Sequence, residues 1–142
     1  MPDAVQGIEV GHVATFTHAV TADDIQKFAD VTGDTNPVHL DPKWAARTRF
    51  KEPIAHGMLS AGVVSAALGT QLAPGAVVIY LSQNIRFRAP VKPGDTLTAK
   101  VTATSVDVER SRVALDTVVT KQDGTEVLTG DALVMVEPPN EA

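Results

Sequence analysis

The sequence predicts an α+β fold in which one long apolar helix is covered by a curved antiparallel sheet of about five strands. Residues 58–72 are apolar on almost every helical face, which is typical of a helix buried in the centre of a domain. Four β-rich runs then follow one another, separated by turn residues, as in consecutive antiparallel strands. A sheet that curves around the helix is the simplest arrangement that buries it.

Length and composition favour a single domain over residues 1–142. A chain of 142 residues has the size of one ordinary domain, and its 44% hydrophobic content is too high for intrinsic disorder. The net charge of −5, without a run of like charges, argues against a nucleic-acid partner. The absence of cysteine excludes a disulfide scaffold, a thiol nucleophile and a thiolate metal site.

Neither a membrane segment nor an export signal is evident in the sequence. The longest apolar stretch, residues 58–73, is interrupted by polar residues and is too short to cross a bilayer. The first residues, Met1–Ala4, lack the basic and apolar regions of a signal peptide. We therefore expect a cytoplasmic protein without a membrane partner.

The elements before the apolar helix are marked by local signals. Residues 13–20 alternate in polarity and predict a strand. Thr21, three residues before Asp24, predicts the N-cap of a helix that ends at Gly33. Pro37 lacks an amide donor and disfavours helix at the residue before it, so residues 34–40 are predicted to form an irregular loop.

The remaining elements follow from capping and turn residues. An N-cap aspartate followed by proline predicts a short helix over residues 41–48. The β-rich runs predict strands over residues 77–87, 96–108, 112–122 and 126–136. Asp123-Gly124 predicts a two-residue hairpin turn between the last two strands.

Asp34, Asn36 and His39 form a candidate catalytic cluster on the predicted loop. A carboxylate and an imidazole on one rigid loop can bind a water molecule between them and act as acid and base. Alternatively, Asp34 forms a turn and His39 is an ordinary core or surface histidine, because both residue types are common in such places. Composition and spacing alone do not decide between these interpretations.

Three motifs resemble those of MaoC-like dehydratases, in particular the single-domain (R)-specific enoyl-CoA hydratases. Residues 33–41, GDTNPVHLD, are similar to the hydratase motif of that family at every position. Residues 53–58, PIAHGM, and residues 87–95, FRAPVKPGD, resemble the family in the same order along the chain. The resemblance covers roughly residues 12–136, and it implies the hot-dog fold, in which a sheet wraps a central helix.

The resemblance also implies a reaction and its residues. The reaction is addition of water to a trans-2-enoyl-CoA to give the (3R)-3-hydroxyacyl-CoA without a metal or other cofactor, in fatty acid metabolism and the supply of polyhydroxyalkanoate precursors. Asp34 and His39 would activate the water, although the sequence does not tell which is base and which is acid. The backbone amide of Gly57 would form the oxyanion hole, or Gly57 would merely permit a tight entry into the helix. Asn36 and His56 would support the site.

Substrate contacts are expected at two further groups of positions. The acyl pocket is expected at Ser65, Leu68 and Leu133. The phosphates of coenzyme A are expected at Arg86, Arg88 and Lys92. Alternatively, Ser65 is a small residue for close packing of the helix, and each cation is a solvated charge at a strand edge. No metal site is predicted, because the spacing of the histidines and aspartates matches no known ligand pattern.

Two other functions compete with hydration. A thioesterase of the same fold commonly carries a catalytic carboxylate on or near the central helix, and residues 58–73 contain neither an acidic residue nor a histidine. A non-catalytic module that binds acyl thioesters would not need the pair Asp34 and His39. We also expect a homodimer, formed through the apolar strand at residues 77–87, because exposed strand edges tend to pair. A helix at residues 41–48 that caps this edge would instead leave a monomer.

Overall fold

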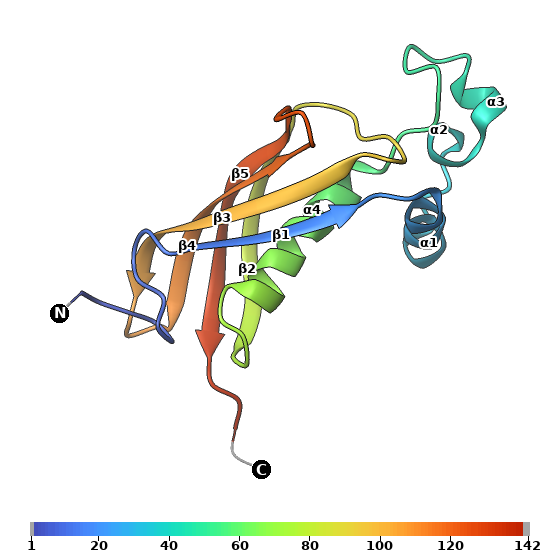
Figure 1. The fold of residues 1–142 in the computed structure, drawn as a ribbon. Coiled ribbons are helices and arrows are strands. Elements are labelled where there is room, and N and C mark those ends of the chain that lie inside the picture. Colours follow the sequence, from blue (N-terminus) through green and yellow to red (C-terminus); the bar gives the residue numbers. More distant parts are fainter. Residues whose placement is uncertain (1, 141–142) are drawn as a thin grey trace.

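Residues 2–140 are described by a computed structural model, and five strands in them form one antiparallel sheet. The strand order is β1-β3-β4-β5-β2, so that β1 and β2 are the two edges (Figure 1). The strands are β1 Val13–Ala19, β2 Val77–Phe87, β3 Thr96–Asp107, β4 Arg112–Thr120 and β5 Glu126–Glu137. The predicted α+β fold with a five-stranded antiparallel sheet is therefore confirmed.

The central helix lies across one face of this sheet (Figure 1). It comprises α4, Gly57–Ala66, and continues directly into η1, Ala67–Gln71, a turn of π-helix. Its sheet-facing side is buried and contains Leu59, Val63, Val64, Ala67 and Leu68. No helix among residues 2–140 is long and apolar enough to cross a membrane.

The opposite side of the central helix is open, which corrects the prediction that every face is buried. The Met58 side chain is 56% exposed, and Gly62, Ser65 and Gly69 are exposed as well. Apolar and small residues on both sides made the sequence look uniformly apolar. The sheet covers only one of these sides, and the small residues on the other side leave room for a groove.

The side chains that face the helix alternate along the strands, as pleating requires. On β4, for example, four alternate side chains are buried completely, namely Val113, Leu115, Thr117 and Val119. Thr117 is the polar member of this row. It lies in the core of the sheet and hydrogen bonds to Gln83 on the edge strand β2.

The β4–β5 hairpin has a three-residue loop, not the two-residue turn that Asp123-Gly124 suggested. The Lys121 amide donates to the Thr125 carbonyl oxygen over 2.9 Å, and the Gly124 amide donates to the Lys121 carbonyl oxygen over 3.0 Å. Gly124 has a φ of 87°, a left-handed conformation that favours glycine. The glycine is thus required one position later in the turn than a two-residue hairpin would need it.

Helix α1, Ala22–Thr32, has the ends that the sequence predicts. The Asp24 amide donates to the Thr21 hydroxyl, and the Thr21 amide donates to the Asp24 carboxylate, each over 3.0 Å. Gly33 ends the helix with a φ of 82°. This end directs the chain from α1 toward Asp34.

Two single-turn helices follow α1, where the sequence predicted a loop and a longer helix. They are α2, Pro37–Leu40, and α3, Pro42–Ala45. Pro37 is the first residue of α2, where a missing amide donor costs nothing, so that the proline begins a helix turn rather than preventing one. Figure 1 shows α3 beyond the end of the sheet, away from the length of the edge strand β2.

Candidate active site

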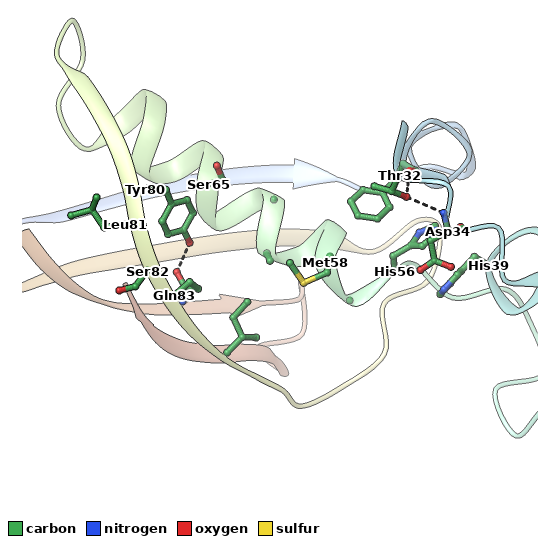
Figure 2. A pocket seen from close by; sticks show the side chains of 15 residues that line it. Thr32, Asp34, His39, His56, Met58, Ser65, Tyr80, Leu81, Ser82 and Gln83 are labelled. Atoms are coloured by element: carbon green, nitrogen blue, oxygen red, sulfur yellow. Dashed lines mark hydrogen bonds between the residues drawn. The ribbon is translucent and has the colours of Figure 1, made fainter. Parts of the chain in front are cut away.

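A cavity of about 720 Å³ lies between α4, β2 and the segment that joins α1 to α2. Asp34, His39 and His56 lie at one end of it, and Tyr80 and Ser65 lie toward the other (Figure 2). Apolar side chains and glycines make up much of the remaining wall. The cavity therefore joins a polar end to an apolar length along the helix, as a site for a chain-like ligand requires.

His39 is held by one of its two ring nitrogens. Its Nδ1 lies 2.7 Å from the carbonyl oxygen of Ile54, which can only accept a hydrogen bond. Nδ1 therefore carries the proton, and Nε2 of the neutral ring is an acceptor. Because the ring lines the cavity, Nε2 is available to take a proton from a molecule bound there.

Asp34 reaches the same end of the cavity from the turn after Gly33. Its carboxylate accepts a hydrogen bond from the Asn36 amide over 3.3 Å, and the Asn36 side chain in turn accepts one from the Val38 amide over 3.1 Å. Asn36 is thus the N-cap of α2, the helix that carries His39. The structure therefore brings Asp34 and His39 together, and it gives Asn36 a role in holding the turn between them.

His56 contacts both of these residues. Its Nε2 donates to the main-chain oxygen of Asp34 over 2.9 Å. Its ring stacks on that of His39, with centroids 3.8 Å apart and planes at 28°, and also packs against Phe28. Only 2% of His56 is exposed. A buried ring that touches both residues holds their relative positions.

The three polar side chains at this end are close enough to share one small ligand. One carboxylate oxygen of Asp34 and one nitrogen each of His39 and His56 all lie within 4.8 Å of one another. A cluster of this size can bind one water molecule by hydrogen bonds or one divalent cation by coordination. The carbonyl oxygens of Ile54 and Asp34 already engage one nitrogen of each histidine.

Gly57 is the first residue of α4 and lines the cavity next to this cluster. No hydrogen bond joins its amide to another group within residues 2–140, as is usual for the first amides of a helix. A Cβ at this position would lie 3.0 Å from Cε1 of the Phe87 ring, so a side chain here would press on that exposed ring. The missing side chain thus admits Phe87 and leaves the amide free beside the cavity.

The predicted acyl positions are only partly in this cavity. Ser65 lines it. Leu68 does not, because it is on the sheet-facing side of the helix and is only 1% exposed. Leu133 also does not, because its neighbours in β5, Ala132 and Val134, are buried toward the helix and strand alternation turns Leu133 to the opposite face. Of the three expected acyl positions, only Ser65 therefore lines this cavity.

Tyr80 and Gln83 line the cavity and were missed in the sequence. Residues three apart in a regular strand point to opposite faces, so the alternation rule separates them. A β-bulge at Leu81 shifts the register between Tyr80 and Ser82 and brings the side chains of Tyr80 and Gln83 to the same cavity. The spacing of these two polar groups in the sequence is too weak a signal to override the alternation rule.

The predicted cations are separated in the structure. Arg88 lines a second hollow of about 270 Å³, which also contacts Gly57 and contains Arg49, a residue that sequence reasoning missed. The Arg88 Nε donates to the Thr129 hydroxyl over 2.9 Å. Lys92 lies 3.7 Å from the Glu52 carboxylate. Arg86 is exposed on β2 and lines neither hollow.

The chain and its fold are those of a known class of proteins. The chain matches the MaoC-like domain over residues 7–126, and it belongs to this family. The (R)-specific enoyl-CoA hydratase of Rhodospirillum rubrum is 45% identical over 131 residues, which are 92% of this chain and 90% of that protein.

Two solved structures extend the comparison. The unliganded R-hydratase PhaJ1 from Pseudomonas aeruginosa has a TM-score of 0.86 at 44% identity, over 94% of this chain and 84% of that one. The (R)-hydratase from A. caviae involved in PHA biosynthesis has a TM-score of 0.86 at 40% identity, over 94% of this chain and 99% of that one. The hot-dog fold expected from the motifs is thereby confirmed.

Proposed function

We propose that this protein is an (R)-specific enoyl-CoA hydratase, a hydro-lyase that adds water to a trans-2-enoyl-CoA to give the (3R)-3-hydroxyacyl-CoA. The observation that carries the proposal is that Asp34 and His39 face the same end of an apolar cavity, close enough to share one water molecule. The (R)-specific hydratase at 45% identity supports the same reaction.

In this reaction the water between Asp34 and His39 adds to carbon 3 of the enoyl thioester. Asp34 as a carboxylate and His39 through Nε2 are both acceptors, which suits a water molecule that donates one hydrogen to each. As the carbon–oxygen bond forms, the water loses a proton to one of the pair, and that proton is then passed to carbon 2 from the same side, so that one water molecule is added in total. Delivery from one side gives syn addition and a single product configuration.

Negative charge develops on the thioester oxygen during this addition, and Gly57 is placed to stabilise it. The Gly57 amide is at the N-terminus of α4, where the helix dipole also favours negative charge. An oxyanion donor of this kind typically contributes about 10²–10³ in rate. This role uses only the backbone amide and no side chain, which is compatible with glycine at this position.

The substrate is proposed to be a coenzyme A thioester. Its acyl chain would occupy the apolar length of the main cavity, and its phosphates would be met by the cations around the second hollow, Arg49 and Arg88. Lys92 would contribute less, because Glu52 lies beside it. We propose a cytoplasmic enzyme that supplies (3R)-hydroxyacyl-CoA, consistent with the PHA-related hydratase from A. caviae.

A homodimer through the edge strand β2 is proposed as the active form. Val77, Ile79 and Leu81 on this edge are each about two-fifths exposed, which is more apolar surface than an open edge normally presents to water. The open side of α4 lies along the same cavity wall as β2. A second copy on β2 would therefore cover both features.

Absorbance of the enoyl thioester tests the proposed reaction. Hydration removes the conjugated double bond, so purified protein should bleach crotonyl-CoA without releasing free thiol, and the product should be the (3R) isomer. Bleaching together with stoichiometric thiol release would indicate a thioesterase. Binding of crotonyl-CoA with unchanged absorbance would indicate a binding module. Either result would overturn the hydratase assignment.

A further inference from the structure

Tyr80, which is 39% exposed, lines the main cavity toward the end away from the polar cluster. Figure 2 shows its ring between β2 and α4, alongside Ser65, while Asp34 and His39 lie beyond Met58 in the other direction. From Gly57 to Ser65 the helix rises by about 12 Å. A ligand that starts at the Gly57 amide and follows the helix would therefore meet the Tyr80 ring after a short run.

The phenol of Tyr80 is held by a hydrogen-bond network that leads into the core. The Tyr80 hydroxyl donates to Oε1 of Gln83. Nε2 of Gln83 donates to the Asn84 carbonyl oxygen over 2.8 Å and to the Thr117 hydroxyl over 3.0 Å. Both hydrogens of the amide are engaged, so that its oxygen is fixed toward Tyr80. Burial raises the pKa of the Tyr80 phenol, which therefore keeps the proton that it donates.

The network crosses three strands at a position where the middle strand has a glycine. Gln83 is on β2 and Thr117 is on β4, and the strand between them, β5, places Gly130 opposite Thr117. A Cβ at Gly130 would come within 3.3 Å of the Gln83 amide nitrogen and would collide with the Asn84 main-chain oxygen. The glycine thus lets the Gln83 side chain pass over β5 to a threonine that is completely buried.

We propose that Tyr80 is the specificity-determining end wall of the acyl site and restricts the enzyme to short acyl chains. Gln83 and Thr117 are positioning residues that act through Tyr80 by fixing its ring. The inference rests on the proposed function, because it takes the main cavity as the acyl site. A long chain must displace an anchored ring, whereas a short chain lies between the Gly57 amide and that ring.

The test compares a short and a long substrate in wild type and in variants at this wall. For wild type, kcat/KM should be higher for crotonyl-CoA than for trans-2-dodecenoyl-CoA. Tyr80→Ala removes the ring and should raise the long-to-short ratio of kcat/KM about tenfold or more. Tyr80→Phe keeps the ring and removes only the hydroxyl that anchors it, so its ratio should rise far less than that of Tyr80→Ala, to about the level of Thr117→Val.

Thr117→Val tests the positioning role, since Thr117 is outside the cavity lining. It removes the acceptor behind Gln83 and should raise the long-to-short ratio less than Tyr80→Ala does, through a lower KM for the long substrate rather than a higher kcat. Thermal unfolding of each variant shows whether a changed long-to-short ratio of kcat/KM comes from a destabilised fold. If Thr117→Val folds and keeps the wild-type ratio of kcat/KM, Thr117 does not position the Tyr80 ring.

Dissociation constants for saturated butyryl-CoA and dodecanoyl-CoA separate this inference from the reaction. Tyr80→Ala should tighten dodecanoyl-CoA relative to butyryl-CoA, whether or not the protein hydrates anything. If wild type hydrates no enoyl-CoA but Tyr80→Ala still shows this shift in binding, the end-wall proposal stands and the hydratase proposal is refuted. Three results would overturn the end wall. The first is a Tyr80→Ala protein with wild-type ratios in both kinetics and binding. The second is a Tyr80→Phe protein whose ratio shifts as far as that of Tyr80→Ala, and the third is failure of both wild type and Tyr80→Ala to bind either acyl-CoA.

Discussion

The imidazole of His56 donates from Nε2 to the main-chain oxygen of Asp34 over 2.9 Å, while the same ring stacks on His39. The residue just before the central helix therefore fixes both members of the proposed catalytic pair. Asp34 follows α1 and His39 lies on α2, and the two are joined by the Asn36 cap and by the His56 ring. Their mutual position depends on a buried ring that does not need to react itself.

Substitution of His56 should separate its hydrogen bond from its stacking. His56→Phe keeps a ring against His39 and loses the donor, whereas His56→Gln keeps a donor at a similar reach and loses the ring. We expect both to lower kcat more than they raise KM, because each releases one member of the pair. His56→Phe also removes the donor to the Asp34 main-chain oxygen, and the loss of this hydrogen bond should cost about 0.5–1.5 kcal/mol in the free energy of unfolding.

The matched comparison for His56 is steady-state kinetics on crotonyl-CoA with thermal unfolding of the same preparations. A loss of stability without a loss of kcat in both variants would restrict His56 to folding. Full kcat in one variant would show which of the two contacts positions the pair.

Removal of either member of the pair should abolish most of the activity. We expect Asp34→Ala and His39→Ala each to lower kcat by about 10²–10⁴, the range of general acid–base catalysis. The double variant should be little worse than either single one, since both groups act on the same water. Asn36→Ala is the control, because it removes only the cap of α2 and should cost about 1 kcal/mol in stability. A His39→Ala enzyme with near-normal turnover contradicts the assignment.

How far the sequence predicts this structure depends on how local each feature is. The ends of α1 follow from Thr21, Asp24 and Gly33, because these residues make hydrogen bonds to their own neighbours. The pairing of Asp34 with His39 followed from one contiguous motif for the same reason. Leu133 was expected in the acyl site, but the face on which its side chain lies is set by the register of β5 with β4 and β2.

Features that depend on several elements could not be predicted. The open side of α4 reflects which elements are present to cover it, not its composition. Tyr80 and Gln83 share a wall only because of the bulge at Leu81, and Gln83 reaches Thr117 only across Gly130. None of these relationships has a short-range signal strong enough to override strand alternation.

Stability in acid should depend on Asp95. Burial opposes ionisation of this carboxyl, but hydrogen bonds from the Gln122 side chain and the Lys92 amide and the charge of Lys121 outweigh it and lower its pKa. A lowered pKa in the folded state contributes stability that is present above the unfolded-state value, about 3.9, and is lost as pH falls through the folded value. The free energy of unfolding should therefore decrease as the pH falls below about 4.

Urea unfolding across this pH range compares Asp95→Asn with Asp3→Asn, an exposed carboxylate near the N-terminus. The first substitution should lower stability at neutral pH and flatten its decrease in acid, whereas the second should leave the curve as in wild type. Equal slopes in all three proteins would rule out Asp95 as a source of the acid dependence.

Divalent cations should not be required for hydration. Asp34 and His39 can share a water molecule, and two of the four ring nitrogens of His39 and His56 already donate to carbonyl oxygens. Protein dialysed against EDTA should therefore retain its activity on crotonyl-CoA, and added Zn²⁺ or Mg²⁺ should not raise it. Activity that disappears on chelation and returns with one cation would instead make these residues a metal site.

The edge strand β2 should hold two copies of the chain together. Ile79 on β2 and Val13 on β1 are 41% and 46% exposed, so that they offer a matched pair of apolar positions on the two edges of one sheet. Light scattering at micromolar concentration should give at least twice the chain mass of 14.9 kDa for wild type and for Val13→Lys. Ile79→Lys should give a particle of single-chain mass, because a charge on the paired edge is buried without a partner.

The activity of these two variants connects the dimer with the site. The β2 edge and the open side of α4 both border the main cavity, so a monomeric Ile79→Lys protein should lose most of its hydration of crotonyl-CoA while remaining folded. Val13→Lys should remain active, since β1 lies at the far edge of the sheet from the cavity wall on β2. A wild type that is fully active at single-chain mass would refute the dimer. Dissociation by Val13→Lys and not by Ile79→Lys would move the interface to β1.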